Sequence, residues 1–301
     1  MTNPEITIET PSKIPMDLVV HGYRERQCVL TLMRQLNRLV SAVQKHRGVS
    51  LARLAGDGLF VDDVSQVQAQ VNQRLEVWRL SVEQFDHLVP LRDQQNIQHG
   101  WHTVCNNWEE DALLENFEYH SFLIDQLLQL NGGLGRKLET SLLLMNQPPI
   151  DDTADDDPVL YLVCRRLPEL VEDLARIRGL ATHAAVVGEC HEDHQKKLLY
   201  WLQCVERKNR ELISNIENLD SKIQKQWRAL SELKNYELKL AFFLNTVNKD
   251  IIRARSSKAD ARQLFTLGSE IIDVYVDGVD GGISLLQTDL EAELEAWLIS
   301  V

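Results

Sequence analysis

Residues 36–54 read LNRLVSAVQKHRGVSLARL, and residues 167–185 read LPELVEDLARIRGLATHAA. In both stretches apolar residues recur at steps of three and four, the spacing that places them on one face of an α-helix. The two stripes match at an offset of 131 residues, and the match includes the pairs Arg47-Gly48 and Arg178-Gly179. The sequence therefore predicts two long helices of similar design, one in each half of the chain.

The rest of the chain has the composition of further helices. The 301 residues include only 14 glycines and 8 prolines, and the stretches between them are rich in strong helix formers. A second match relates Leu123-Ile124-Asp125 to Ile271-Ile272-Asp273. We expect helices over 17–55, 62–88, 94–106, 109–130, 135–145, 159–187, 191–255 (one or two helices), 257–275 and 283–298, with Asn131-Gly132-Gly133 as an interhelical turn.

These features predict an all-α fold of two linked four-helix bundles that are related by internal duplication. The segment NQPPIDDTADDDP, which begins at residue 146, has three prolines and five aspartates and is typical of a linker. The expected organisation is a polar N-terminal tail at 1–16, a first bundle at 17–146, an acidic linker at 147–158 and a second bundle at 159–301.

The charge of the chain limits the classes of partner. There are 32 Lys and Arg against 45 Asp and Glu, which gives a formal net charge of -13. Duplex nucleic acids and anionic membranes are bound by clustered basic residues, so we expect neither to be bound directly. The five cysteines form no CxxC pair, and neither a signal peptide nor a membrane span is visible, so we expect a cytoplasmic protein with reduced thiols.

Arg47 and Arg178 stand at positions where the apolar stripe predicts a leucine. A guanidinium group cannot lose its charge at neutral pH, and an unpaired one in a protein core costs several kcal/mol. Each arginine must therefore meet an anion. The glycine that follows each one, Gly48 or Gly179, leaves room for a close helix contact or for a small ligand.

Two kinds of anion could satisfy these arginines. One is a protein carboxylate, for which Asp125 and Asp273 are the candidates because each is embedded in an apolar triplet. The other is a small planar oxyanion held by both arginines at the bundle junction, which suits the fork of a guanidinium group. Ser50 and Thr182, each within a turn of an arginine, could add hydroxyl donors.

Three strings resemble the nitrate- and nitrite-sensing domain family: QKHRGVSLARLAG at 44–56, ARIRGLATHAAVVG at 175–188 and YHSFLIDQLL at 119–128. The resemblance implies two linked four-helix bundles and a sensor whose signature arginines, here Arg47 and Arg178, bind nitrate or nitrite. The sequence departs from the family at His46, where an acidic residue is common.

In this family the sensing domain is attached to an output module, such as an RNA-binding antitermination module, a receptor signalling region or a cyclase. This sequence ends after its last expected helix, so we expect either a separate protein partner or the sensory part of a longer protein. The alternative function is a helical adaptor, in which the two arginines form structural ion pairs.

Other groupings of reactive residues favour packing or solvation over chemistry. Cys190 and His194 are four apart, as are metal ligands on a helix, but no further ligand is indicated. The run at 131–137 lacks the strand and the spacing of a phosphate loop. We therefore expect no enzyme activity, no cofactor and no metal. The charged stretch at 206–239 could form a homodimer surface.

Overall fold

A computed structural model describes residues 15–56, 61–85, 87–139, 157–254, 256–257 and 259–300. Every regular element in these ranges is helical, so the predicted all-α class is confirmed. Residues 1–14 of the expected tail and 147–156 of the expected linker lie outside the described residues. The domain boundaries and the internal duplication stay predictions.

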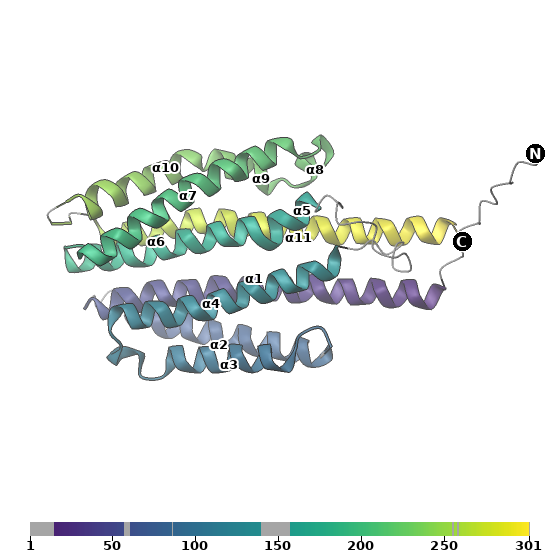
Figure 1. Cartoon of the computed structure of the whole chain (residues 1–301), viewed down its shortest axis with the longest axis horizontal. Helices are drawn as coiled ribbons and strands as arrows, with labels where there is room; N and C mark the ends of the chain where they lie inside the picture. Colours follow the sequence, from purple (N-terminus) through teal and green to yellow (C-terminus); the bar gives the residue numbers. More distant parts are fainter. Residues whose placement is uncertain are drawn as a thin grey trace, which may run out of the picture.

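The first half forms a group of helices around one long helix. Helix α1 packs against α2 and α4, and α3 packs against α4 (Figure 1). Short 3-10 helices at Trp108–Glu110 and Arg136–Leu138 flank α4. The bounds are α1 (Met16–Leu54), α2 (Val61–Gln84), α3 (Leu91–Cys105) and α4 (Leu113–Gly135).

The second half is built around α6 and α11. Helix α6 packs against α7 and α11, and α9 and α10 also contact α11 (Figure 1). Two segments are π-helical, Leu162–Arg166 and Val247–Ile252. The α-helices are α5 (Pro158–Tyr161), α6 (Leu167–Val187), α7 (Glu192–Asn218), α8 (Ser221–Gln226), α9 (Ala229–Asn235), α10 (Glu237–Thr246) and α11 (Ala261–Ser300).

Local chemistry sets several of the helix ends. Helix α5 begins after Asp157, whose carboxylate accepts hydrogen bonds from the backbone N–H groups of Val159 and Leu160. Helix α6 ends at Gly188, which has a φ of +84°, a left-handed conformation that glycine adopts without steric cost. These two helix ends are thus fixed by residues visible in the sequence.

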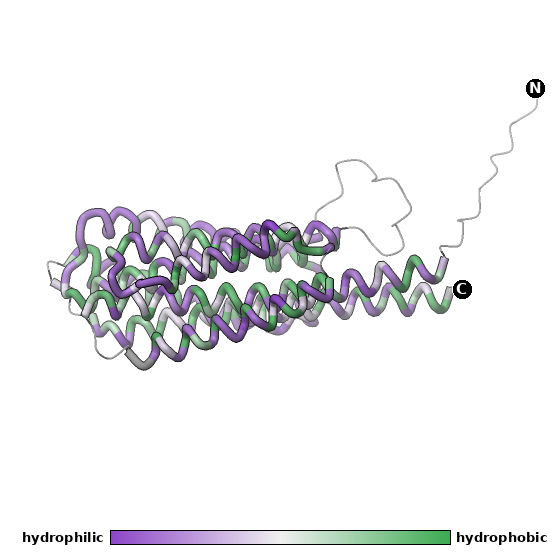
Figure 2. Tube along the Cα trace, turned by 90° about the horizontal axis from the view of Figure 1, so that it is seen from below, coloured by the Kyte–Doolittle hydropathy of each residue, from purple (hydrophilic) through white to green (hydrophobic). Residues whose placement is uncertain are grey.

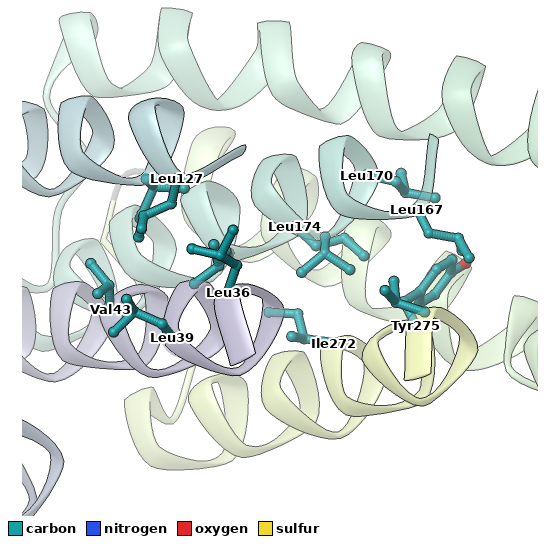
Figure 3. Close-up of a cluster of buried hydrophobic side chains, with 14 of the residues drawn as sticks. Leu36, Leu39, Val43, Leu127, Leu167, Leu170, Leu174, Ile272 and Tyr275 are labelled. Carbon is teal, nitrogen blue, oxygen red and sulfur yellow. The ribbon is translucent and has the colours of Figure 1, made fainter. Parts of the chain in front are cut away.

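One hydrophobic core joins the two halves, because α1 packs against both α6 and α11. A single cluster of buried apolar side chains includes residues from both halves. Figure 3 shows part of this cluster. The labelled side chains are Leu36, Leu39 and Val43 of α1, Leu127 of α4, Leu167, Leu170 and Leu174 of α6, and Ile272 and Tyr275 of α11. The junction between the halves is therefore a packed interior.

The structure corrects three expected helix boundaries. Helix α4 continues through Asn131-Gly132-Gly133, where a turn was expected. Helix α11 continues through Gly278, Gly281 and Gly282, so the expected helices 257–275 and 283–298 are one helix. A side chain at Gly282 would overlap Val163 and Trp227, which explains the glycine by close packing. Within 191–255, where one or two long helices were expected, α7 ends at Asn218, and α8, which begins after the N-cap Asp220, is followed by α9 and α10.

The start of α1 and the end of α11 extend beyond the other helices (Figures 1 and 2). The two helices run in opposite directions there and pack against each other. Val19 of α1 and Leu290 and Trp297 of α11 are buried in this part of the chain. Both helices also reach the junction of the two halves, so they connect the projecting end with the site described below.

Candidate functional site: a buried arginine junction

The two Arg-Gly pairs meet where α1 crosses α6. A Cβ atom added at Gly179 would lie 3.8 Å from the Cα atom of Gly48 and 3.2 Å from Cδ1 of Leu51. A Cβ atom at Gly48 would lie 2.7 Å from Cε2 of Phe265 and 3.6 Å from both Nε and Nη2 of Arg178. The glycines therefore permit a close crossing of the helices and allow the Arg178 guanidinium group to lie against α1.

Arg47 is completely buried and is paired with a carboxylate. Its Nη1 donates to Oε1 of Glu172 at 2.8 Å, and its Nη2 donates to Oε2 at 3.1 Å. This bidentate geometry is the strongest arrangement for a guanidinium and a carboxylate. Nη1 also donates to Oγ of Ser121 at 3.0 Å, and the guanidinium lies 5.1 Å from the ring centre of Phe117.

Glu172 of α6 is equally buried, with 2% of its surface exposed. Besides Arg47, its carboxylate accepts hydrogen bonds from Nε of Arg176 at 2.6 Å and from Nε2 of Gln44 at 2.9 Å. Burial acts to raise the pKa of Glu172, but Arg47 and Arg176 outweigh it, so the pKa lies below its ordinary value. Glu172 is therefore an anion at neutral pH, and sequence reasoning missed it.

Arg178 has only neutral hydrogen-bond partners. Its Nη1 donates to Oγ of Ser269 at 2.9 Å, its Nη2 donates to the backbone carbonyl of Gln44 at 2.9 Å, and the guanidinium lies 4.7 Å from the ring centre of Phe265. It forms no ion pair with any carboxylate in the described ranges, although it is only 3% exposed. Burial and the charge of Arg47 lower the pKa of Arg178 to about 10, so the group stays charged at neutral pH.

The expected structural ion pairs are wrong in their partners. Asp125 does not pair with Arg47; its Oδ1 lies 3.0 Å from Nη2 of Arg176, at the edge of the site. Asp273 attracts Arg178 electrostatically but is not within ion-pair distance of it, among the residues whose side chains are described. The two arginines are thus satisfied unequally, since Arg47 has an anion and Arg178 has none.

Several buried donors near the crossing are without a hydrogen-bond partner in the described chain. They are Nε of Arg47, Nε of Arg178 and the hydroxyl of Thr182, which lies one turn after Arg178 on α6. Unpaired buried donors are rare in proteins, and a water molecule or an anion can act as their acceptor. Ser50 is different, because its hydroxyl lies 3.1 Å from the carbonyl of Arg47 and 3.0 Å from Oδ1 of Asn116.

His46, which precedes Arg47, is buried in a neutral histidine pair. His120 Nδ1 lies 2.7 Å from the carbonyl of Asn116, which can only accept, so His120 Nε2 is the acceptor for His46 Nδ1–H at 2.8 Å. Burial lowers the pKa of His46 to about 4. Trp101 and Trp108 pack edge-on against its ring. This pair adds no charge beside Arg47 at neutral pH.

Three histidines around the end of α6 and the start of α7 lie close together. The rings of His183 and His191 pack against that of His194, with centres 5.8 and 5.9 Å apart. No group of three or more His, Cys, Asp and Glu residues among those described is placed to hold a metal ion. A search of the same residues for a helix long and apolar enough to cross a bilayer also finds none.

Comparison with solved structures supports the fold. The sequence matches no family model and no curated protein. The structure of the NasR transcription antiterminator is similar to this chain, with a TM-score of 0.69 and 16% sequence identity over 93% of this chain and 73% of that chain. The overall helical fold is thus shared with that antiterminator.

Proposed function

We propose that this chain is a regulatory sensor that binds nitrate or nitrite at the crossing of α1 and α6. The observation that carries the proposal is the state of Arg178, which is buried and charged and has only neutral partners. Arg47 and Thr182 supply further unpaired donors beside it. A planar oxyanion of a few atoms provides the missing negative charge and accepts hydrogen bonds from several of these donors at once.

The Arg-Gly resemblance favours nitrate or nitrite over other small anions. The likeness to a transcription antiterminator supports the regulatory part of the proposal, because gene regulation is one output that the resemblance implies. We expect the signal to pass to a separate protein or to an attached effector. We expect no direct binding of RNA or DNA by the chain itself, because its formal net charge is -13 and nucleic-acid phosphates are bound by basic residues.

The mechanism is a shift between two arrangements of the helices. Without an anion, burial and then the charge of Arg47 act against the charged form of Arg178, and both lower its pKa. With an anion between them, both guanidinium groups are attracted to the same point. A ligand shifts such an equilibrium only by its differential affinity for the two arrangements, and this difference in electrostatic energy supplies it.

The test is thermal unfolding with increasing nitrate. At nitrate about a hundred times its Kd, the wild-type chain should gain about 2.7 kcal/mol of stability. The variant Arg178→Met keeps the length and apolar stem of the side chain and should show no gain, and neither should Arg47→Ala. Arg165→Met, at an exposed position before α6, removes the same charge and should respond as the wild type does.

An undiminished nitrate response in Arg178→Met would remove the site assignment. The second candidate function is a helical adaptor, which is favoured by one observation: Arg47 already has Glu172 as a structural partner. If the chain is an adaptor, nitrate should stabilise neither the wild type nor any variant, and Arg178 would be a packed cation held by Ser269 and the carbonyl of Gln44.

A further inference from the structure

Glu172 presents to Arg47 a planar anion whose shape and charge resemble those of the proposed ligand. A carboxylate and a nitrate or nitrite ion are planar, carry one negative charge and place two oxygens on a common central atom. The two oxygens of Glu172 accept hydrogen bonds from the two Nη atoms of Arg47, at 2.8 and 3.1 Å. The best oxyanion position on Arg47 is therefore filled by the protein's own anion.

We propose that Glu172 is an internal competitor of the ligand: it holds Arg47 in the unliganded chain, and nitrate or nitrite displaces it. This inference rests on the proposed function. The competition explains the unequal state of the arginines, in which Arg178 lacks an anion while Arg47 has one. Binding then exchanges an intramolecular ion pair for an ion that can serve both guanidinium groups.

The displaced carboxylate has other donors to receive it. Nε of Arg176, one turn later on α6, already donates to Oε1 of Glu172 at 2.6 Å. Arg176 lies at the edge of the site, with its side chain 20% exposed, and it also pairs with Asp125. In the proposed exchange, the Glu172 side chain rotates about its own bonds, releases Arg47 and keeps its contact with Arg176. The exchange therefore leaves no buried carboxylate unpaired.

The exchange also changes what connects the two halves of the chain. Arg47 is on α1 and Glu172 is on α6, so their ion pair bridges the two helices at the crossing. Gln44 adds a second bridge, because its side chain donates to Glu172 while its carbonyl accepts from Arg178. Removing Glu172 from Arg47 breaks a direct interhelical bond, so ligand binding is coupled to the relative position of α1 and α6.

The competition has a measurable cost in affinity. When the binding-competent state is only a fraction of the population, the apparent Kd rises by the inverse of that fraction. Removing the competing charge should therefore tighten binding. The informative variant is Glu172→Gln, which keeps the shape and one acceptor oxygen but not the charge.

The matched control is Asp173→Asn. Asp173 is the next residue on α6 and is also buried. Its carboxylate pairs with Lys208 at 2.8 Å and lies 4.0 Å from Nη1 of Arg176, and it forms no ion pair with Arg47 in the described part of the chain. The Asp173→Asn variant removes one negative charge from the same turn of α6 and leaves the ion pair between Glu172 and Arg47 in place. A general electrostatic effect would appear in both variants, whereas competition at Arg47 would appear in one.

The experiment is calorimetric titration of the wild-type chain and both variants with sodium nitrate at constant ionic strength. We expect Glu172→Gln to bind nitrate at least tenfold more tightly than the wild type, and Asp173→Asn to stay within threefold of it. Equal or weaker binding by Glu172→Gln, with wild-type binding intact, would overturn the inference and leave the proposed function standing. Absence of binding in all three proteins would overturn the proposed function itself.

A stability measurement covers the case in which Glu172→Gln folds poorly. Without an anion this variant leaves Arg47 without an ion-pair partner, so its Tm should lie below that of the wild type. At saturating nitrate, its Tm should lie within a few degrees of the Tm of the wild type in the same buffer. The conservative variant Glu172→Asp keeps the charge on a shorter side chain. It should bind nitrate with an affinity between those of the wild type and Glu172→Gln. A Tm deficit in Glu172→Gln that nitrate does not reduce would contradict the inference.

Discussion

At the level of single residues, the two buried arginines define the site, because burying a charged group in a protein core costs free energy. The apolar stripe around Arg47 and Arg178 predicts correctly that both are buried, since burial follows from helical periodicity. Their partners could not be predicted in the same way. Glu172 stands beside Asp173 in a charged run that a sequence pattern assigns to solvent, and only the rotation of α6 against α1 brings it to Arg47.

The two arginines should respond differently to the same substitution. Arg47→Met leaves Glu172 buried with one fewer cation, so we expect a loss of about 3 kcal/mol in the free energy of unfolding. Arg178→Met removes a buried charge that has no counter-ion in the described chain, so stability should change by less than about 1 kcal/mol or rise. Urea unfolding in nitrate-free buffer measures both. A larger loss in Arg178→Met than in Arg47→Met would contradict this assignment of partners.

The neutral histidine pair beside Arg47 predicts a dependence of stability on pH. The folded pKa of His46, about 4, lies below the ordinary value of 6.5. The contribution of His46 to the free energy of unfolding is therefore fully present above pH 6.5 and is lost as the pH falls toward 4. The reason is that His46 binds a proton in the unfolded chain at a pH at which it stays neutral in the folded chain.

Between pH 7.5 and 5.0, this histidine should account for about 2 kcal/mol of lost stability. The variant His46→Gln should lose less stability than the wild type over that range, whereas the exposed His99→Gln should follow the wild type. Urea midpoints at the two pH values provide the measurement. Identical pH dependence in all three proteins would show that His46 is not buried as a neutral group.

At the scale of elements, the sequence predicts helices well where apolar periodicity is strong and poorly where glycines interrupt it. Helix α1 matches its expected range within a residue at each end. Helices α4 and α11 pass through glycines that would normally end a helix. Tertiary packing decides these cases, because contact with another helix offsets the helix propensity that a glycine loses, about 1 kcal/mol each.

Substitution by alanine at two of these glycines should change the free energy of unfolding in opposite directions. At Gly132 in α4 an added Cβ would meet no atom within 4 Å, so Gly132→Ala should raise stability by about 0.5 to 1 kcal/mol through helix propensity. At Gly282 in α11 the added atom would overlap Val163 and Trp227, so Gly282→Ala should lower stability by about 1 to 3 kcal/mol. Chemical unfolding compares them directly, and stabilisation by both would contradict the packing of α11.

At the scale of the whole molecule, the two halves share one core, and the site lies inside it. The match at an offset of 131 residues places Arg47 and Arg178 on different helices, and the structure brings those helices together at Gly48 and Gly179. A sequence pattern cannot reveal this crossing, because nothing local specifies which faces of α1 and α6 meet. Since α1 also extends into the projecting end beside α11, a change at the crossing can reach that end through a single helix.

The most direct test of the central claim is isothermal titration of the unmodified chain with nitrate, with chloride and sulfate as control anions at matched ionic strength. We expect saturable heat with one nitrate bound per chain, no saturable heat with chloride or sulfate, and loss of the nitrate signal in Arg178→Met. The absence of nitrate binding, or equal binding of all three anions, would contradict that claim.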